Sequence, residues 1–131
     1  MHDTVEIFRL ASGLARYAGA RQAVTAQNIA NADTPGYRAR DLAPFAEVVD
    51  EAPVASLKTT RAGHLARPST GESFSLATRI DATSPASPNG NSVSLDTEML
   101  RAAEIRQQHD MALSVYRSAL GVLRSALGRG R

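Results

Sequence analysis

The sequence predicts a mainly α-helical protein in which two long helices, one at each end, flank a loop-rich insert. Apolar residues recur at alternating spacings of three and four near both ends, which is typical of coiled-coil-like helices. The middle differs, because residues 38–92 contain all six prolines except Pro35. A chain of 131 residues that is 43% hydrophobic but only 5% aromatic is one ordinary domain with a thin core. We therefore divide it into residues 1–33, 34–92 and 93–131.

The first helical pattern runs from about Thr4 to Ala32 and is rich in alanine. Such a helix spans roughly 40–45 Å, whereas a compact domain of this length has a radius of gyration of about 14 Å, so the helix should project beyond a compact core. Its expected apolar seam consists of Ile7, Leu10, Leu14, Tyr17, Arg21, Val24, Asn28 and Asn31. A polar residue on a seam costs stability but fixes register, so the two asparagines imply a partner helix to which they hydrogen-bond.

A turn should follow this helix at the sequence Thr-Pro-Gly-Tyr, residues 34–37. Pro35 disfavours the α region at Thr34, and Pro-Gly suits the two central positions of a type II turn. The helix is therefore expected to end near residues 31–33, and Tyr37 should begin an extended segment.

The insert is predicted to consist of loops with room for a short β-hairpin. Residues 56–60 and 74–80 have some β character, and they are separated by polar, turn-rich stretches. Phe45, Val48 and Val49 could make a small satellite contact.

The second helix should begin around residues 92–96, with either Ser92 or Ser94 as N-cap, and run to Leu127 before Gly128 and Gly130 end it. Its expected seam consists of Leu95, Met99, Ala102, Arg106, His109, Leu113, Tyr116, Leu120, Leu123 and Leu127. The seam is strongest from Leu113 onwards, and we expect that part to be buried only against another subunit. Polar groups on both seams, at Asn28, Asn31, Arg106 and His109, likewise require neighbours and predict an assembly subunit.

No catalytic or metal site is predicted. His2, His64 and His109 are far apart in the sequence, and none has a second His or a carboxylate at metal-ligand spacing. The sequence contains neither a Gly-x-Ser-x-Gly motif nor a Gly-rich phosphate loop, so we expect no enzyme activity and no cofactor. The absence of cysteine excludes a disulfide framework but does not identify the compartment.

A net charge of +2 and a pI near 9.5 allow a nucleic-acid or membrane-binding role. The basic residues are scattered, however, and form no cluster interleaved with aromatic residues. A basic helical module that binds membrane or nucleic acid stays an alternative, which salt-dependent retention on anionic liposomes or DNA would test. We expect no membrane insertion, because no run approaches the ~20 apolar residues of a membrane span. The acidic N-terminal residues also predict that no cleaved signal peptide is present.

Three stretches resemble one known family, in the same order and with roughly the same spacing. They are Asn-Ile-Ala-Asn-Ala-Asp-Thr-Pro-Gly-Tyr-Arg-Ala-Arg-Asp at 28–41, Leu-Lys-Thr-Thr-Arg-Ala-Gly-His-Leu at 57–65 and Asn-Gly-Asn-Ser-Val-Ser-Leu-Asp-Thr-Glu-Met at 89–99. The first closely resembles the N-terminal signature of the bacterial flagellar basal-body rod proteins, and the likeness is greatest to the proximal-rod type. Together with the terminal helices, the resemblance covers nearly the whole chain. The chain departs from the family's pattern at two positions: Ser94 stands at a usually acidic position, and Ile105 stands where the family often has Asn.

The resemblance implies a structural subunit of the proximal rod, the torque-transmitting axle that crosses the periplasm. Its partners would be further copies of itself, adjoining rod proteins, the rod-base adaptor and the flagellar type III export gate, through which the family is exported unfolded. Another rod component of the same family is the alternative. The residues expected to act in assembly are Leu10, Leu14, Tyr17, Val24, Asn28, Asn31, Pro35, Gly36, Tyr37, Leu113, Tyr116, Leu120, Leu123 and Leu127.

Overall fold

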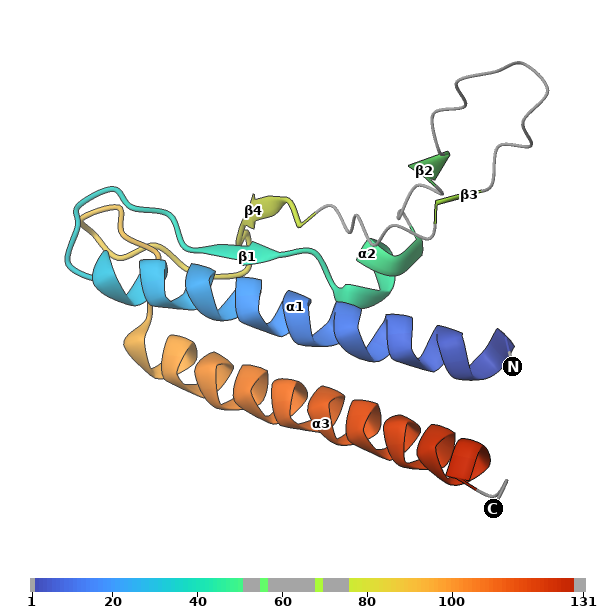
Figure 1. Cartoon of the computed structure of the whole chain (residues 1–131). Coiled ribbons are helices and arrows are strands. Elements are labelled where there is room, and N and C mark those ends of the chain that lie inside the picture. Colours follow the sequence, from blue (N-terminus) through green and yellow to red (C-terminus); the bar gives the residue numbers. More distant parts are fainter. Residues whose placement is uncertain (1, 51–54, 57–67, 70–75, 129–131) are drawn as a thin grey trace.

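Two long helices dominate the computed structural model, which describes residues 2–50, 55–56, 68–69 and 76–128. Helix α1 is His2–Ala30 and helix α3 is Leu95–Gly128. They lie side by side and antiparallel, so that both chain termini are at the same end of the pair (Figure 1). We call this the open end, and the opposite end, where the chain enters and leaves the insert, the closed end. The predicted mainly α-helical architecture is confirmed.

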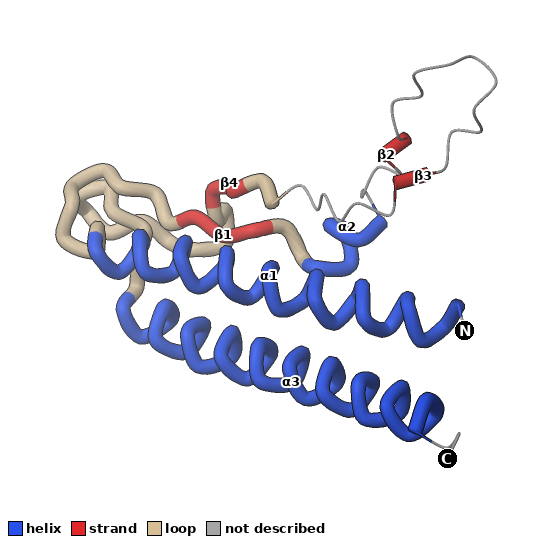
Figure 2. Tube along the Cα trace, viewed as in Figure 1, coloured by secondary structure: helices blue, strands red, loops and turns tan. Residues whose placement is uncertain are grey.

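In its described residues the insert contains the short helix α2 (Phe45–Asp50) and four short strands. Strand β1 (Arg40–Leu42) pairs antiparallel with β4 (Thr78–Ile80), and β2 (Ala55–Ser56) pairs antiparallel with β3 (Pro68–Ser69). Strands β1 and β4 lie beside α1, and β2 and β3 lie farther from it (Figure 2). The two segments predicted to have β character overlap β2 and β4, while residues 57–60 and 74–75 lie outside the described residues. The pairing of β1 with β4 was not predicted.

The turn after α1 has the expected geometry. Gly36 has a φ of 73°, and the Tyr37 N–H donates to the Thr34 carbonyl over 3.2 Å. Positive φ at the third residue and this hydrogen bond are the features of a type II turn. The predicted conformation at Pro35-Gly36 is therefore confirmed.

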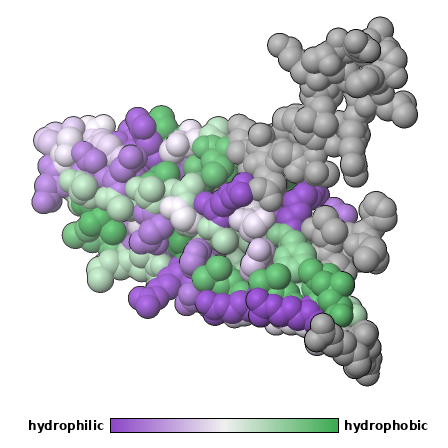
Figure 3. Space-filling view, viewed as in Figure 1, coloured by the Kyte–Doolittle hydropathy of each residue, from purple (hydrophilic) through white to green (hydrophobic). Residues whose placement is uncertain are grey.

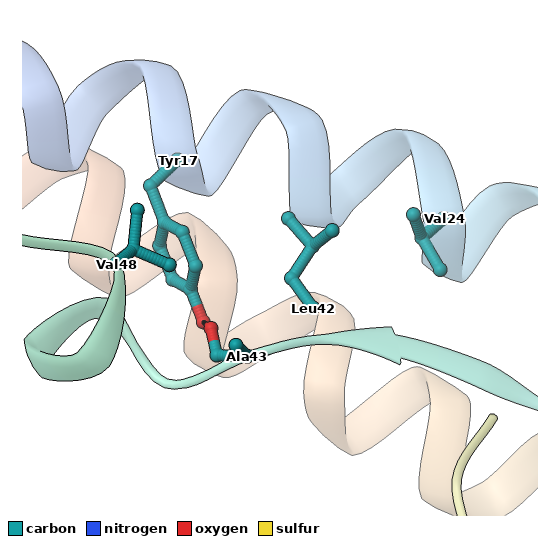
Figure 4. Packing of buried hydrophobic residues seen from close by; sticks show 5 residues of the cluster. All are labelled: Tyr17, Val24, Leu42, Ala43 and Val48. Carbon is teal, nitrogen blue, oxygen red and sulfur yellow. Dashed lines mark hydrogen bonds between the residues drawn. The ribbon is translucent and has the colours of Figure 1, made fainter. Parts of the chain in front are cut away.

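The hydrophobic core is small and lies between α1 and the segment from β1 to α2 (Figure 4). Its buried members are Tyr17, Val24, Leu42, Ala43 and Val48. Phe45 packs against this cluster and lies 5.4 Å from Tyr17 between ring centroids. The expected contact of Phe45 and Val48 is therefore part of the main core.

The contact stripe of α3 differs from the predicted seam. The buried residues are Glu98, Ile105, Ala112 and Ala119, spaced by seven. The large seam residues flank this stripe, and Leu95 and Met99 are 50% and 67% exposed. On α1, Ala18 is fully buried and lines a groove together with Ile105. The observed contact uses alanines, which let the two helices approach closely. The sequence pattern had instead predicted a contact made mainly by leucine and methionine.

Candidate functional site: assembly surfaces and the polar clasp

The closed end is held together by buried polar side chains that connect α1, α3 and the insert. We call these side chains the polar clasp: Asn28, Asp81, Asn91, Glu98 and Arg101. The Asn28 amide group donates to the Arg40 carbonyl over 2.8 Å and to Glu98 Oε2 over 3.1 Å. Its Oδ1 accepts from the Arg40 N–H over 3.1 Å and from the Tyr37 hydroxyl over 3.4 Å. Asn28 is fully buried and saturated with hydrogen bonds.

This corrects the expectation that Asn28 needs a neighbouring subunit. Its helical partner is α3 of the same chain, and β1 supplies the remaining groups. Asn31 also finds partners locally, because its amide donates to the Gln27 carbonyl over 2.8 Å and its Oδ1 accepts from the Thr34 hydroxyl over 3.3 Å. The strand beside α1 was not foreseen, so its backbone groups could not be counted as partners.

Arg101 links the two carboxylates of the clasp. It donates to Glu98 Oε1 over 3.0 Å and, through its other terminal nitrogen, to Asp81 Oδ2. Burial alone would raise the pKa of Asp81, but hydrogen bonds from Thr83 and Arg101 outweigh it and lower that pKa far below its usual value. Burial alone would lower the pKa of Arg101, but Asp81 and Glu98 raise it instead. Asp81 and Arg101 are therefore held as a charged pair, and Glu98 accepts a further hydrogen bond from Arg101.

Asn91 closes the end of α1 from sixty residues away in the sequence. Its amide group contacts the carbonyls of Asn31, Ala32 and Thr34 over 3.0, 2.8 and 2.8 Å. These carbonyls lie just beyond the end of α1, where those of Asn31 and Thr34 also accept main-chain N–H groups of the turn and that of Ala32 depends on Asn91. Asn91 Oδ1 accepts from the Val93 N–H over 2.7 Å, so the same side chain also fixes the approach to α3.

Two glycine turns meet beside Asn91. The Gly36 N–H donates to the Asn89 carbonyl over 3.0 Å, and the Ser92 N–H donates to the Tyr37 carbonyl over 3.0 Å. Gly90 has a φ of 80°, and a Cβ placed there would lie 3.3 Å from the Gly36 Cα. Glycine is thus required at position 90 both by conformation and by space.

The structure also distinguishes the two N-cap candidates. The Ser92 hydroxyl oxygen accepts from the Ala39 N–H over 2.9 Å and so belongs to the closed end. Ser94 directly precedes the helix, and its carbonyl accepts from the Glu98 N–H over 2.9 Å. Ser94 therefore occupies the N-cap position.

Another polar seam residue of α1, Arg21, pairs with β1. Its guanidinium donates to both carboxylate oxygens of Asp41, over 2.9 and 2.8 Å. This hydrogen bonding raises the pKa of Arg21 above its usual value. Tyr17, one turn earlier, donates its hydroxyl to the Ala43 carbonyl over 2.9 Å, and burial raises its pKa. This side of α1 is thus occupied by the insert.

The predicted assembly residues fall into three groups. Leu14, Tyr17, Val24 and Asn28 face the insert or the clasp, and Leu10 is half-buried on α1. Asn31, Pro35, Gly36 and Tyr37 form the turn at the closed end. On α3, Leu113 and Leu120 are half-buried, while Tyr116, Leu123 and Leu127 are 38%, 37% and 75% exposed. Their role in assembly stays a prediction.

The open end exposes an apolar surface. Phe8 of α1 and Tyr116 of α3 make an edge contact there, with ring centroids 5.2 Å apart. Beyond them, Val122 is 65% exposed and Leu127 is 75% exposed. Figure 3 shows hydrophobic residues gathered over the C-terminal half of α3, next to a strip of hydrophilic ones. We call Tyr116, Leu120, Leu123 and Leu127, which follow one another by three or four residues and so share one face of α3, the α3 apolar surface.

A groove of about 600 Å³ runs between the two helices. Ala18, Gly19 and Gln22 line it from α1, and Ala102, Ala103, Ile105, Arg106 and His109 line it from α3. Two polar residues of the predicted seam, Arg106 and His109, therefore border this groove. Small side chains on both walls would allow a further helix to approach closely.

The sequence reasoning missed most of the clasp. No role was predicted for Asp81, Asn91, Glu98 or Arg101. Only Asn28 on the α1 seam signalled that a buried polar partner existed.

Comparison with known proteins agrees with this architecture. The model of the family described as flagella basal body rod protein matches residues 10–38, from the middle of α1 through the turn. The flagellar basal body rod protein FlgB of Agrobacterium fabrum is 33% identical over 116 residues, 87% of each chain. The FlgB proteins of Escherichia coli and Salmonella typhimurium are 35% and 32% identical over 120 residues, 84% of each chain. The chain belongs to the flagellar basal-body rod protein family.

Within this family the chain is of the FlgB type, since its relatives match along most of its length. The matched N-terminal segment contains Asn28 and the Pro35-Gly36 turn, which form the α1 side of the closed end. In the part of this rod protein that the structure describes, no helix is both long and apolar enough to span a membrane.

Proposed function

We propose that this protein is a structural subunit of the proximal rod of the bacterial flagellar basal body, without catalytic activity. The similarity to FlgB proteins over most of the chain supports this proposal. It also favours the FlgB type over another rod component such as the FlgC type. The torque-transmitting axle of which the subunit would be part crosses the periplasm, and the chain would reach it by type III export.

We further propose that α3 carries the main assembly surface. The observation that supports this is the α3 apolar surface, where Tyr116, Leu123 and Leu127 remain 38%, 37% and 75% exposed in the single chain. Large apolar side chains exposed together on one face are typical of interaction sites. Other copies of the subunit and adjoining rod proteins would cover this surface, and the rod-base adaptor and export gate would be further partners. Neither nucleic acid nor lipid is a proposed partner.

A charge placed on this surface tests the proposal. Leu120→Asp would put an unpaired carboxylate within the apolar surface, where even truncation of a buried Leu costs about 2–5 kcal/mol. We expect a strain with this substitution to export the protein but to yield isolated basal bodies without rods. Leu127→Asp, at a side chain already 75% exposed, should block incorporation without changing the helicity of the single chain.

Ser118→Asp is the matched control, because it adds the same charge to α3 at an exposed position outside the apolar surface. It should leave rod assembly intact. Normal rods in the Leu120→Asp and Leu127→Asp strains would show that α3 does not join subunits. Loss of rods in the Ser118→Asp strain as well would show that the apolar surface has no special role.

A further inference from the structure

The Asn89-Gly90 pair lies at the centre of the closed end. The Asn89 main-chain carbonyl accepts the Gly36 N–H over 3.0 Å, and its side-chain Oδ1 accepts the Asn91 N–H over 3.0 Å. The Gly90 N–H donates to the Ser87 carbonyl over 2.8 Å. Asn89 therefore connects the turn after α1 with the segment that carries Asn91.

Asparagine followed by glycine is also a chemically reactive pair. Glycine has no Cβ, so its main-chain nitrogen can approach the side-chain carbon of the preceding asparagine with little hindrance. We propose that Asn89 is a site of spontaneous deamidation whose rate is controlled by the closed end: slow while the end is assembled, and fast when it opens. The proposal concerns this chain alone and does not depend on its role in the rod.

The reaction needs only water and a base from the solvent. After solvent base removes the Gly90 amide proton, the Gly90 nitrogen attacks the Asn89 Cγ and forms a C–N bond. The bond from Cγ to the side-chain nitrogen breaks, and ammonia leaves with a proton from solvent. Water then opens the resulting five-membered succinimide at either carbonyl, which gives aspartate or isoaspartate at position 89 without any oxidation or reduction.

The folded structure opposes the first step in three ways. The Gly90 N–H is engaged by the Ser87 carbonyl, so its removal costs a hydrogen bond. The Asn89 side chain is held by the Asn91 N–H, which restricts its rotation towards Gly90. The Gly90 φ of 80° is fixed beside Gly36, so the main chain cannot readily adjust. Opening of the closed end removes all three restraints.

The isoaspartate product could not rebuild the closed end. In isoaspartate the main chain passes through the former side chain, which adds one carbon and converts the former main-chain carbonyl into a pendant carboxylate. That carbonyl is the acceptor of the Gly36 N–H. The two turns are already close, since a Cβ on Gly90 would lie 3.3 Å from the Gly36 Cα, so a longer chain would push them apart. Asn91, which follows two residues later, could then no longer donate to the carbonyls at the end of α1.

Peptide mapping by mass spectrometry tests the control of the rate. The full chain is incubated in mildly alkaline buffer with and without denaturing urea, and isoaspartate at residue 89 is followed over time. We expect conversion to be at least about tenfold slower in the native buffer, because it must await opening of the closed end. Asn91-Ser92 serves as an internal reference and should react more slowly than Asn89 in urea. Equal rates with and without urea would overturn the proposal.

A second arm tests the consequence. Wild-type chains aged in urea and then diluted should recover less helicity by far-UV circular dichroism than Asn89→Ser chains treated identically. Serine retains a side-chain oxygen that can accept the Asn91 N–H but cannot form a succinimide. Full recovery of helicity by chains shown to carry isoaspartate would refute the claim that the closed end excludes this product.

Discussion

The two ends of the helix pair are built from different interactions. At the closed end, Asn28, Asn91 and Glu98 are at most 2% exposed, and directional hydrogen bonds connect segments distant in the sequence. At the open end, the contact is the apolar edge between Phe8 and Tyr116, and Leu127 beyond it is 75% exposed. The closed end satisfies its own groups, whereas the open end leaves apolar area uncovered. One end thus defines the fold, and the other is available for partners.

The stripe between the ends explains how one helix pair can serve both purposes. Ile105, Ala112 and Ala119 provide the buried contact of α3, and two of the three are small. A narrow contact made by small residues leaves the larger leucines at its sides, where they are free for other helices. So narrow a contact would specify the register of α1 against α3 poorly. The hydrogen bonds of the polar clasp fix that register instead.

The largest expected effect on stability is at Glu98. Glu98→Leu removes the acceptor of both the Asn28 amide and Arg101 inside a site that is 1% exposed. Breaking a buried pair by removing one partner costs about 3–5 kcal/mol, so the urea midpoint should fall strongly. Glu98→Gln is the matched control, since it keeps a side-chain oxygen and the same shape. Equal stability of Glu98→Leu and wild type would mean that the clasp does not hold the helices together.

Asn91→Ala should have the next largest effect, about 2 kcal/mol in the free energy of unfolding. The carbonyls of Asn31, Ala32 and Thr34 would lose their shared donor, and the Val93 N–H would lose its acceptor. Part of the cost is relieved by water, because this turn is partly exposed. Asn31→Ala is the comparison, because its amide reaches only the Gln27 carbonyl of its own helix. If both substitutions cost the same, capping by Asn91 is not special.

The fold was predictable from local pattern, whereas the clasp was not. Periodicity over ten or more residues identified both helices, and Pro35-Gly36 identified the turn, because each depends on neighbours in the sequence. Asn28 and Glu98 are seventy residues apart, and no local signal pairs an amide on one helix with a carboxylate on another. The contact stripe of α3 was missed for a related reason: alanine and glutamate become buried only because another helix lies close. Asn28 on the seam correctly indicated a buried polar partner but not its identity, whereas the side chain of Asn31 bonds to Gln27 and Thr34 nearby in the sequence.

A smaller effect is expected at the turn. Gly36 has a φ of 73° and open space around the position of a Cβ, so Gly36→Val should cost mainly the left-handed conformation, about 1–2 kcal/mol. We expect a lower thermal midpoint and impaired swimming in a strain that carries it. Gly121→Ala gives the contrasting case, because Gly121 lies within α3 with open space around it. That substitution should stabilise by up to about 1 kcal/mol. Stabilisation by both would show that Gly36 does not require positive φ.

The smallest effect, about 1 kcal/mol, should appear as a pH dependence at Asp81. Burial opposes its charge, but hydrogen bonds from Thr83 and Arg101 lower its folded pKa below the ordinary value of 3.8. The unfolded chain therefore binds this proton more readily, so ionised Asp81 stabilises the fold fully above about pH 5 and progressively less as the pH falls through 3.8. Arg101 keeps Glu98 as a partner when Asp81 is protonated, which limits the loss. Urea unfolding between about pH 3 and pH 6 should show a shallower decline for Asp81→Asn than for wild type. If the free energy of unfolding of both proteins declined in parallel, the acid sensitivity would come from other groups in the chain. Ionised Asp81 would then not contribute to the stability of the clasp.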